Sequence, residues 1–187
     1  MTQQESTSAL SRPLLVAVGL AVVLVVGFAA LGLVLGKEEQ TQDVPGRTGP
    51  LALVSIDAPD AGSETCVSLI PKLPLQLPSG KDTLPRRELA APAPLAAVAW
   101  GDAAHDPVVL RCGLPRPSEL SQTSQLRVIS DVQWLQLPGS GSSTWVVVDR
   151  GAYVALTVPD DAGTGPLQDI SATVRDLLPK QPVKTTP

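Results

Sequence analysis

The feature that most constrains this chain is an uninterrupted apolar run near its N-terminus. Leu14–Leu35 is 22 residues long and contains no charged side chain. An α-helix rises about 1.5 Å per residue, so this run would be about 33 Å long, enough to cross a hydrocarbon core of about 30 Å. A helix on a small soluble domain would need polar residues on its outer face, and this run has none. We therefore predict a transmembrane helix at residues 14–36.

A cleaved signal peptide is the alternative for the same run, with Val34-Leu35-Gly36 as the cleavage site. The apolar core of a signal peptide is about 7–15 residues long, which is shorter than this run. We expect a retained anchor with residues 1–13 as a cytoplasmic stub, because Arg12 precedes the run whereas two glutamates offset Lys37 after it. The expected location is the cell membrane, single-pass, with the C-terminal domain extracytoplasmic.

The cysteine content indicates one disulfide bond rather than a metal site. Cys66 and Cys112 are the two cysteines, and His105 is the only histidine. No metal site and no cofactor are predicted, because these residues cannot supply a tetrahedral ligand set at usable spacing. In an oxidising compartment a single pair is best explained as a disulfide. Two free thiols, or a catalytic pair of Cys112 with His105, remain the alternatives.

The remainder of the chain predicts one α+β domain at residues 51–179. Residues 37–50 are a linker rich in charge, proline and glycine, and residues 180–187 are a polar tail expected to be disordered. The fold class expected is an antiparallel sheet with two helices packed on one face. Patterning predicts strands at residues 51–57, 95–100, 107–112, 127–137, 144–149 and 152–158, helices from Ser63 or Asp60 to Ile70 and at 165–178, and a loop at 76–87.

Few residues suggest chemistry. His105 lies between Asp102 and Asp106, so a carboxylate could orient the imidazole as a general base. A solvated hairpin turn explains the same pattern, and no nucleophile motif accompanies it. Asp149-Arg150 is interpreted as an ion pair at the end of a turn.

Three further residues are candidates for ligand binding. Arg111 lies inside an apolar strand, where it calls for a carboxylate counter-ion or a partner's surface. Strand alternation places it opposite the face of Val108, Leu110 and Cys112. Trp134 and Trp145 could line a groove for a lipid or a sugar, although filling the core is the usual role of tryptophan.

Several segments resemble a family of actinobacterial membrane-anchored envelope proteins known as a domain of unknown function. The resemblance covers about residues 51–179. It rests on VSIDAP with Gly62 and Cys66, AWGDAAHDPVVLRCGLPRP at 99–117, VQWL at 132–135, VDR at 148–150 and YVALTVP at 153–159. The family implies a tethered envelope domain and assigns no activity to any residue.

The net charge of −4 argues against electrostatic binding of nucleic acid. We expect a non-catalytic, membrane-anchored envelope protein that serves as an accessory or interaction subunit of a larger membrane complex, respiratory or cell-envelope. The expected partner is therefore a protein in the membrane or envelope. The alternatives are a hydrolase or transferase acting on envelope material through Asp102, His105 and Asp106, and a lipid- or glycan-binding module.

Overall fold

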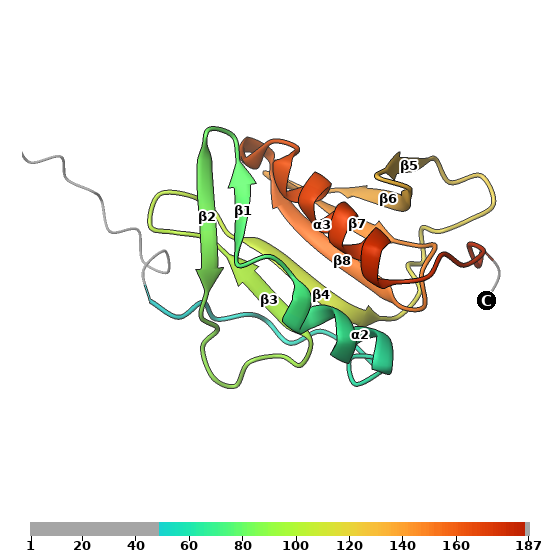
Figure 1. Ribbon diagram of the computed structural model, residues 1–187, viewed down its shortest axis with the longest axis horizontal. Coiled ribbons are helices and arrows are strands. Elements are labelled where there is room, and N and C mark those ends of the chain that lie inside the picture. Colours follow the sequence, from blue (N-terminus) through green and yellow to red (C-terminus); the bar gives the residue numbers. More distant parts are fainter. Residues whose placement is uncertain (1–48, 186–187) are drawn as a thin grey trace, which may run out of the picture. The chain divides into compact units, whose positions relative to one another are not determined.

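The computed structural model describes residues 49–185 and shows an α+β domain built on one eight-stranded antiparallel sheet (Figure 1). The strand order is β1-β2-β3-β4-β8-β7-β6-β5. The strands are β1 (Gln76–Ser79), β2 (Asp82–Arg87), β3 (Ala97–Trp100), β4 (Val108–Leu114), β5 (Leu126–Ile129), β6 (Val132–Pro138), β7 (Ser142–Val147) and β8 (Tyr153–Pro159). The helices are α2 (Glu64–Leu69) and α3 (Gly165–Leu177), with short 3-10 helices η1 (Ile70–Lys72) and η2 (Asp160–Ala162).

The predicted stub, transmembrane helix and most of the linker lie outside the described residues. Within residues 49–185, no helix combines the length and the apolar character needed to cross a membrane. The predicted fold class is confirmed as α+β with an antiparallel sheet and two helices.

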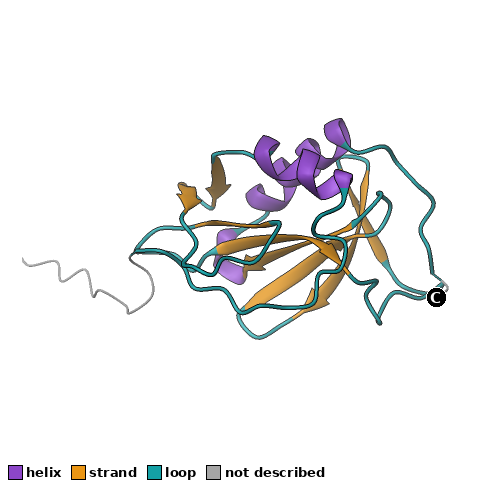
Figure 2. Ribbon diagram, turned by 90° about the horizontal axis from the view of Figure 1, so that it is seen from below, coloured by secondary structure: helices purple, strands orange, loops and turns teal. Residues whose placement is uncertain are grey.

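The sheet curls into a half-barrel, and both helices contribute to the core on one of its faces (Figures 1 and 2). Leu167, Ile170 and Val174 of α3 are buried there, as the helical spacing predicted. Their neighbours in the core include Trp100, Trp134 and the alternate buried residues of β4, which are Val108, Leu110 and Cys112.

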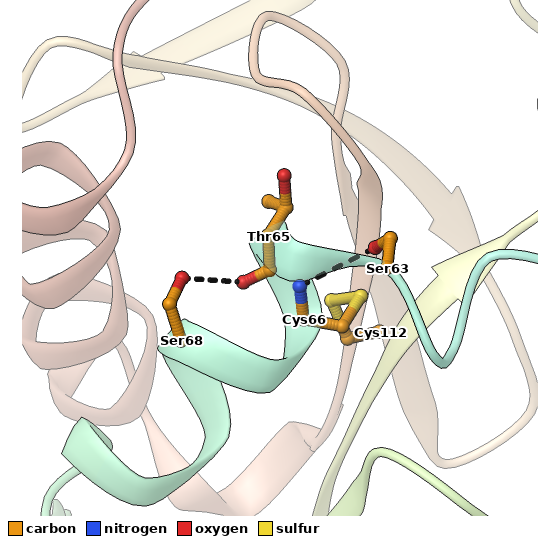
Figure 3. The surroundings of a disulfide bond; sticks show 5 residues. All are labelled: Ser63, Thr65, Cys66, Ser68 and Cys112. Atoms are coloured by element: carbon orange, nitrogen blue, oxygen red, sulfur yellow. Dashed lines mark hydrogen bonds between the residues drawn. A yellow bond between two sulfur atoms is a disulfide. The ribbon is translucent and has the colours of Figure 1, made fainter.

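Helix α2 is short and is held by a cap and a disulfide (Figure 3). Ser63 is its N-cap, and the Ser63 hydroxyl accepts a hydrogen bond from the backbone N–H of Cys66 at 3.4 Å. Cys66 is disulfide-bonded to Cys112 of β4, which confirms the predicted pair. A helix of six residues is too short to persist alone in water, so this attachment and the burial of Leu69 stabilise it.

The opposite face of the sheet carries a smaller core. Leu135, Val146, Val148 and Ala155 form it, and Leu120 of the loop after β4 packs onto them. Val183 of the C-terminal tail also contacts this cluster. Both faces of the central strands are therefore covered in part, which explains their nearly continuous apolar sequences.

Residues 181–185 of the C-terminal tail take part in hydrogen bonds with the domain. The N–H of Gln181 donates to the carbonyl of Asp149 at 2.9 Å. Arg116 donates from its guanidinium to the carbonyls of Lys184 and Thr185, at 3.2 and 2.7 Å. These hydrogen bonds use backbone groups of the tail, so its side-chain composition gave no indication of them.

One predicted loop and two predicted strands were wrong. Residues 76–87 form the β1–β2 hairpin rather than a loop, and Pro78 and Pro85 are tolerated there because the hairpin lies at the sheet edge. Residues 127–137 contain two strands joined by a turn at Ser130-Asp131. The segment 51–57 is not a strand but makes a single bridge from Leu51 to Leu89 and then lies as coil.

The disulfide gives a direct test of the fold. We expect non-reducing peptide mapping to recover Cys66 linked to Cys112, and a Cys66→Ala/Cys112→Ala double variant to lose about 4 kcal/mol of unfolding free energy, because the bond closes a long loop in the unfolded chain. Urea denaturation with and without reductant measures the loss. Two alkylatable thiols in the native protein would contradict the assignment.

Candidate functional site

His105, which the hydrolase alternative would use as a general base, lies in a cluster of carboxylates from two neighbouring loops. His105 Nδ1 lies 2.9 Å from Oδ1 of Asp102, and its Nε2 lies 3.4 Å from Oδ2 of Asp82 in the β1–β2 hairpin. The same Oδ1 of Asp102 accepts the backbone N–H groups of Ala104 and His105, both at 2.9 Å. The sequence indicated Asp102 as a partner but gave no signal for Asp82, which is distant along the chain.

The electrostatics of this cluster favour a protonated histidine. The hydrogen bond to Asp102 raises the pKa of His105 above its ordinary value, and the charges of Asp82 and Asp161 act in the same direction. Burial acts to raise the pKa of Asp102, but hydrogen bonds from His105 and Ala104 outweigh it and lower that pKa. An imidazolium with a carboxylate at each nitrogen has no lone pair left to accept a proton from a substrate. This arrangement ties the two loops together better than it serves a general base.

Asp149 and Arg150 form a buried ion pair rather than an open polar site. Arg150 Nη1 lies 2.8 Å from Oδ2 of Asp149, and both side chains are almost completely buried. Arg150 also donates to the carbonyl of Asp131, and Oδ1 of Asp149 accepts the N–H of Gln133. The pair thus joins the β7–β8 turn to the β5–β6 turn.

Arg111 lies on the predicted face of β4 but without the expected carboxylate. Among the described residues, the hydrogen-bond acceptor of its guanidinium is the carbonyl of Val54, at 2.9 Å. Partial burial lowers the pKa of Arg111, so its environment does not compensate the charge fully. Arg86 has more partners than Arg111. Its guanidinium donates to the carbonyls of Ile70, Leu73 and Pro74 and lies over the ring of Trp100.

The two candidate tryptophans have different environments. Trp134 is completely buried, and its indole N–H donates to the hydroxyl of Ser171 at 2.9 Å. It fills the core and does not line a groove. Trp145 is half-buried and lines a groove of about 560 Å³ beside α3. The structure does not bring Arg111 and Trp145 to the same groove.

Large apolar side chains are exposed on the N-terminal segment of the domain, on α2 and on the loop before β3. Val54, Ile56, Val67 and Leu95 are 79%, 47%, 63% and 71% exposed, and together they are called the apolar surface below. Three grooves of about 430, 200 and 180 Å³ run beside them. The first two share Ile56 as a lining residue and the last two share Leu95, so neighbouring grooves adjoin at these side chains. Arg111 lines the middle groove.

No group of three or more histidine, cysteine, aspartate or glutamate side chains within residues 49–185 could hold a metal ion.

Comparison with known proteins gives a family whose function is unknown. A family model described as "Protein of unknown function (DUF3515)" matches residues 18–183. Neither the curated proteins nor the solved structures contain a match.

The His105 cluster predicts a pH-dependent contribution to stability. Because the pKa of His105 is raised in the folded state, its contribution is complete below the ordinary histidine pKa of about 6.5 and is lost as the pH rises through the raised value. We expect His105→Gln to be measurably less stable than the wild type at pH 5.5, by up to about 1 kcal/mol, since the cluster is partly solvated.

At pH 9 the two proteins should have the same stability, which makes that pH the control. Urea denaturation at both pH values measures the difference. An equal difference at pH 5.5 and pH 9 would contradict the ion-pair assignment.

Proposed function

Because this chain belongs to the DUF3515 family, whose function is unknown, its role must be argued from its own surfaces, and we propose that it is a non-catalytic, membrane-anchored interaction module. The observation that carries the proposal is the apolar surface. Ile56, Val67 and Leu95 line three adjoining grooves, and with the exposed Val54 they form a patch of the kind that marks interaction sites.

The chemistry of this surface favours a protein partner. The groove of about 430 Å³ is lined mainly by apolar groups such as those of Leu114, Val146 and Ala155. These groups suit the apolar side chains of a docking segment. Arg111 lies in the adjoining groove with a backbone carbonyl as its partner among the described residues. A partner that presents apolar side chains and one carboxylate would complement both features.

The position of the surface in the chain suggests that the partner is in the membrane. Val54 and Ile56 lie close in sequence to the predicted anchor at residues 14–36. A coil of the length of the predicted linker has an r.m.s. span of about 20 Å. Such a tether would keep the apolar surface near the bilayer and close to the extracytoplasmic parts of membrane proteins. We propose that the partner belongs to a respiratory or cell-envelope complex.

A photo-crosslinking experiment tests this proposal. The full-length protein carries a photo-reactive amino acid at Leu95, and a matched protein carries it at Val128, which is 66% exposed on β5 and lines none of the three grooves. We expect the Leu95 protein to crosslink in intact membranes to one defined membrane protein. Mass spectrometry identifies the adduct.

Charge substitutions then test whether the apolar surface causes the interaction. We expect Ile56→Glu and Arg111→Glu to reduce the crosslink about tenfold or more, because buried apolar anchors and charge pairs dominate binding energies. Val128→Glu should leave the crosslink unchanged. Equal crosslinking by all three variants would contradict the proposal.

The hydrolase alternative has a test of its own. If the His105→Ala protein folds but fails to complement a deletion strain, the hydrolase function replaces the non-catalytic proposal.

A further inference from the structure

The groove beside Trp145 has the makings of a second, independent binding site. It is lined by residues of β5, β6 and β7 and by residues at the start of α3. Its volume of about 560 Å³ is within the range of about 300–1,000 Å³ that is usual for small-ligand sites. It shares no lining residue with the grooves of the apolar surface.

Trp145 differs from the other two tryptophans in its hydrogen bonding. The indole N–H of Trp100 donates to the carbonyl of Pro74 at 2.9 Å, and that of Trp134 donates to Ser171. Within residues 49–185, Trp145 has no acceptor for its indole N–H. A half-buried tryptophan with an unused N–H offers a ligand both an apolar ring and a donor.

Two side-chain amides and a hydroxyl line the same groove. Gln136 pairs with Trp145 across β6 and β7, and Gln168 and Thr164 approach from α3. The amide nitrogen of Gln136 donates to Ser143 at 3.3 Å, and that of Gln168 donates to Thr164 at 3.4 Å. Among the described residues, neither amide oxygen accepts a hydrogen bond. Each amide nitrogen carries two N–H groups and uses one, so the second is available to a ligand.

Among the residues that the structure describes, Arg127 is the only charged one that lines the groove. It is exposed on β5, and the structure gives its guanidinium no ion pair and no hydrogen bond within the described residues. A guanidinium in this state can bind a carboxylate in a bidentate manner.

We propose that this groove binds a carboxylated sugar unit of an oligosaccharide. The apolar face of a sugar ring would pack on Trp145, and its hydroxyl groups would pair with the amides of Gln136 and Gln168, which donate and accept hydrogen bonds as vicinal hydroxyls require. The sugar carboxylate would pair with Arg127. A fatty acid fits less well, because it would leave these amides desolvated without partners.

The test uses two disaccharides that differ only in the acidic group. N-acetylglucosaminyl-N-acetylmuramic acid carries a lactyl carboxylate, and N,N′-diacetylchitobiose, called chitobiose below, lacks it. The full-length protein in detergent micelles is labelled with ¹⁵N, and its three indole N–H signals are assigned by substitution. We expect the muramyl disaccharide to shift the Trp145 signal in a saturable manner while the Trp100 and Trp134 signals stay in place.

Affinities from the same titrations identify the contacts. Chitobiose should bind about tenfold more weakly than the muramyl disaccharide, and Arg127→Gln should bring the two to equal affinity. Gln168→Ala should weaken the binding of both disaccharides about tenfold. The control is Asp169→Ala, because Asp169 is the next residue of α3 and does not line the groove; this variant should bind both disaccharides as the wild type does. Equal affinity of the wild type for both sugars overturns the carboxylate assignment. If neither sugar shifts the Trp145 signal, the proposed binding site is overturned.

Discussion

Three consecutive residues of β4 fix the N-terminal segment of the domain against the sheet. Gly113 has φ +84°, and a Cβ there would lie 2.2 Å from the backbone N of Ala61, so only glycine lets the segment cross at this point. Its carbonyl accepts the N–H of Asp60 at 3.0 Å. Cys112 holds α2 through the disulfide, and Arg111 holds the carbonyl of Val54. The Arg-Cys-Gly sequence is therefore one structural unit that fixes the segment on both sides of its crossing.

The same crossing explains why apolar side chains remain exposed. The segment crosses β4, which already has β3 and β8 as neighbours, so the residues at 51–57 cannot pair with β4 as a further strand. It lies as coil beside the grooves instead, with Val54 and Ile56 directed to solvent. The proposed partner would bury side chains that the fold holds in place but does not cover.

Local sequence patterns predicted the elements that local interactions determine. The sequence predicted the β7–β8 hairpin and the buried face of α3 correctly. It offered Ser63 or Asp60 as the cap of α2, and the structure shows Ser63. The β5–β6 hairpin was missed because both turn residues have positive φ without glycine or asparagine, a conformation that Arg150 and Lys180 stabilise from distant parts of the chain. At the candidate sites, Trp145 and Arg111 could be named from sequence. The Asp82 contact and the Trp145 groove could not, because each is assembled from elements far apart in the chain.

The central claim is that the segment held by β4 is covered by a partner in the membrane. Hydrogen–deuterium exchange at residues 54–57 tests it most directly, because these backbone N–H groups donate no hydrogen bond within the described part of the chain and should exchange fast in the isolated protein. The measurement compares the protein in gently solubilised membrane complexes with the same protein purified alone. The account predicts slowed exchange at residues 54–57 in the complexes and unchanged exchange at Val128. Equally fast exchange at residues 54–57 in both preparations would contradict it.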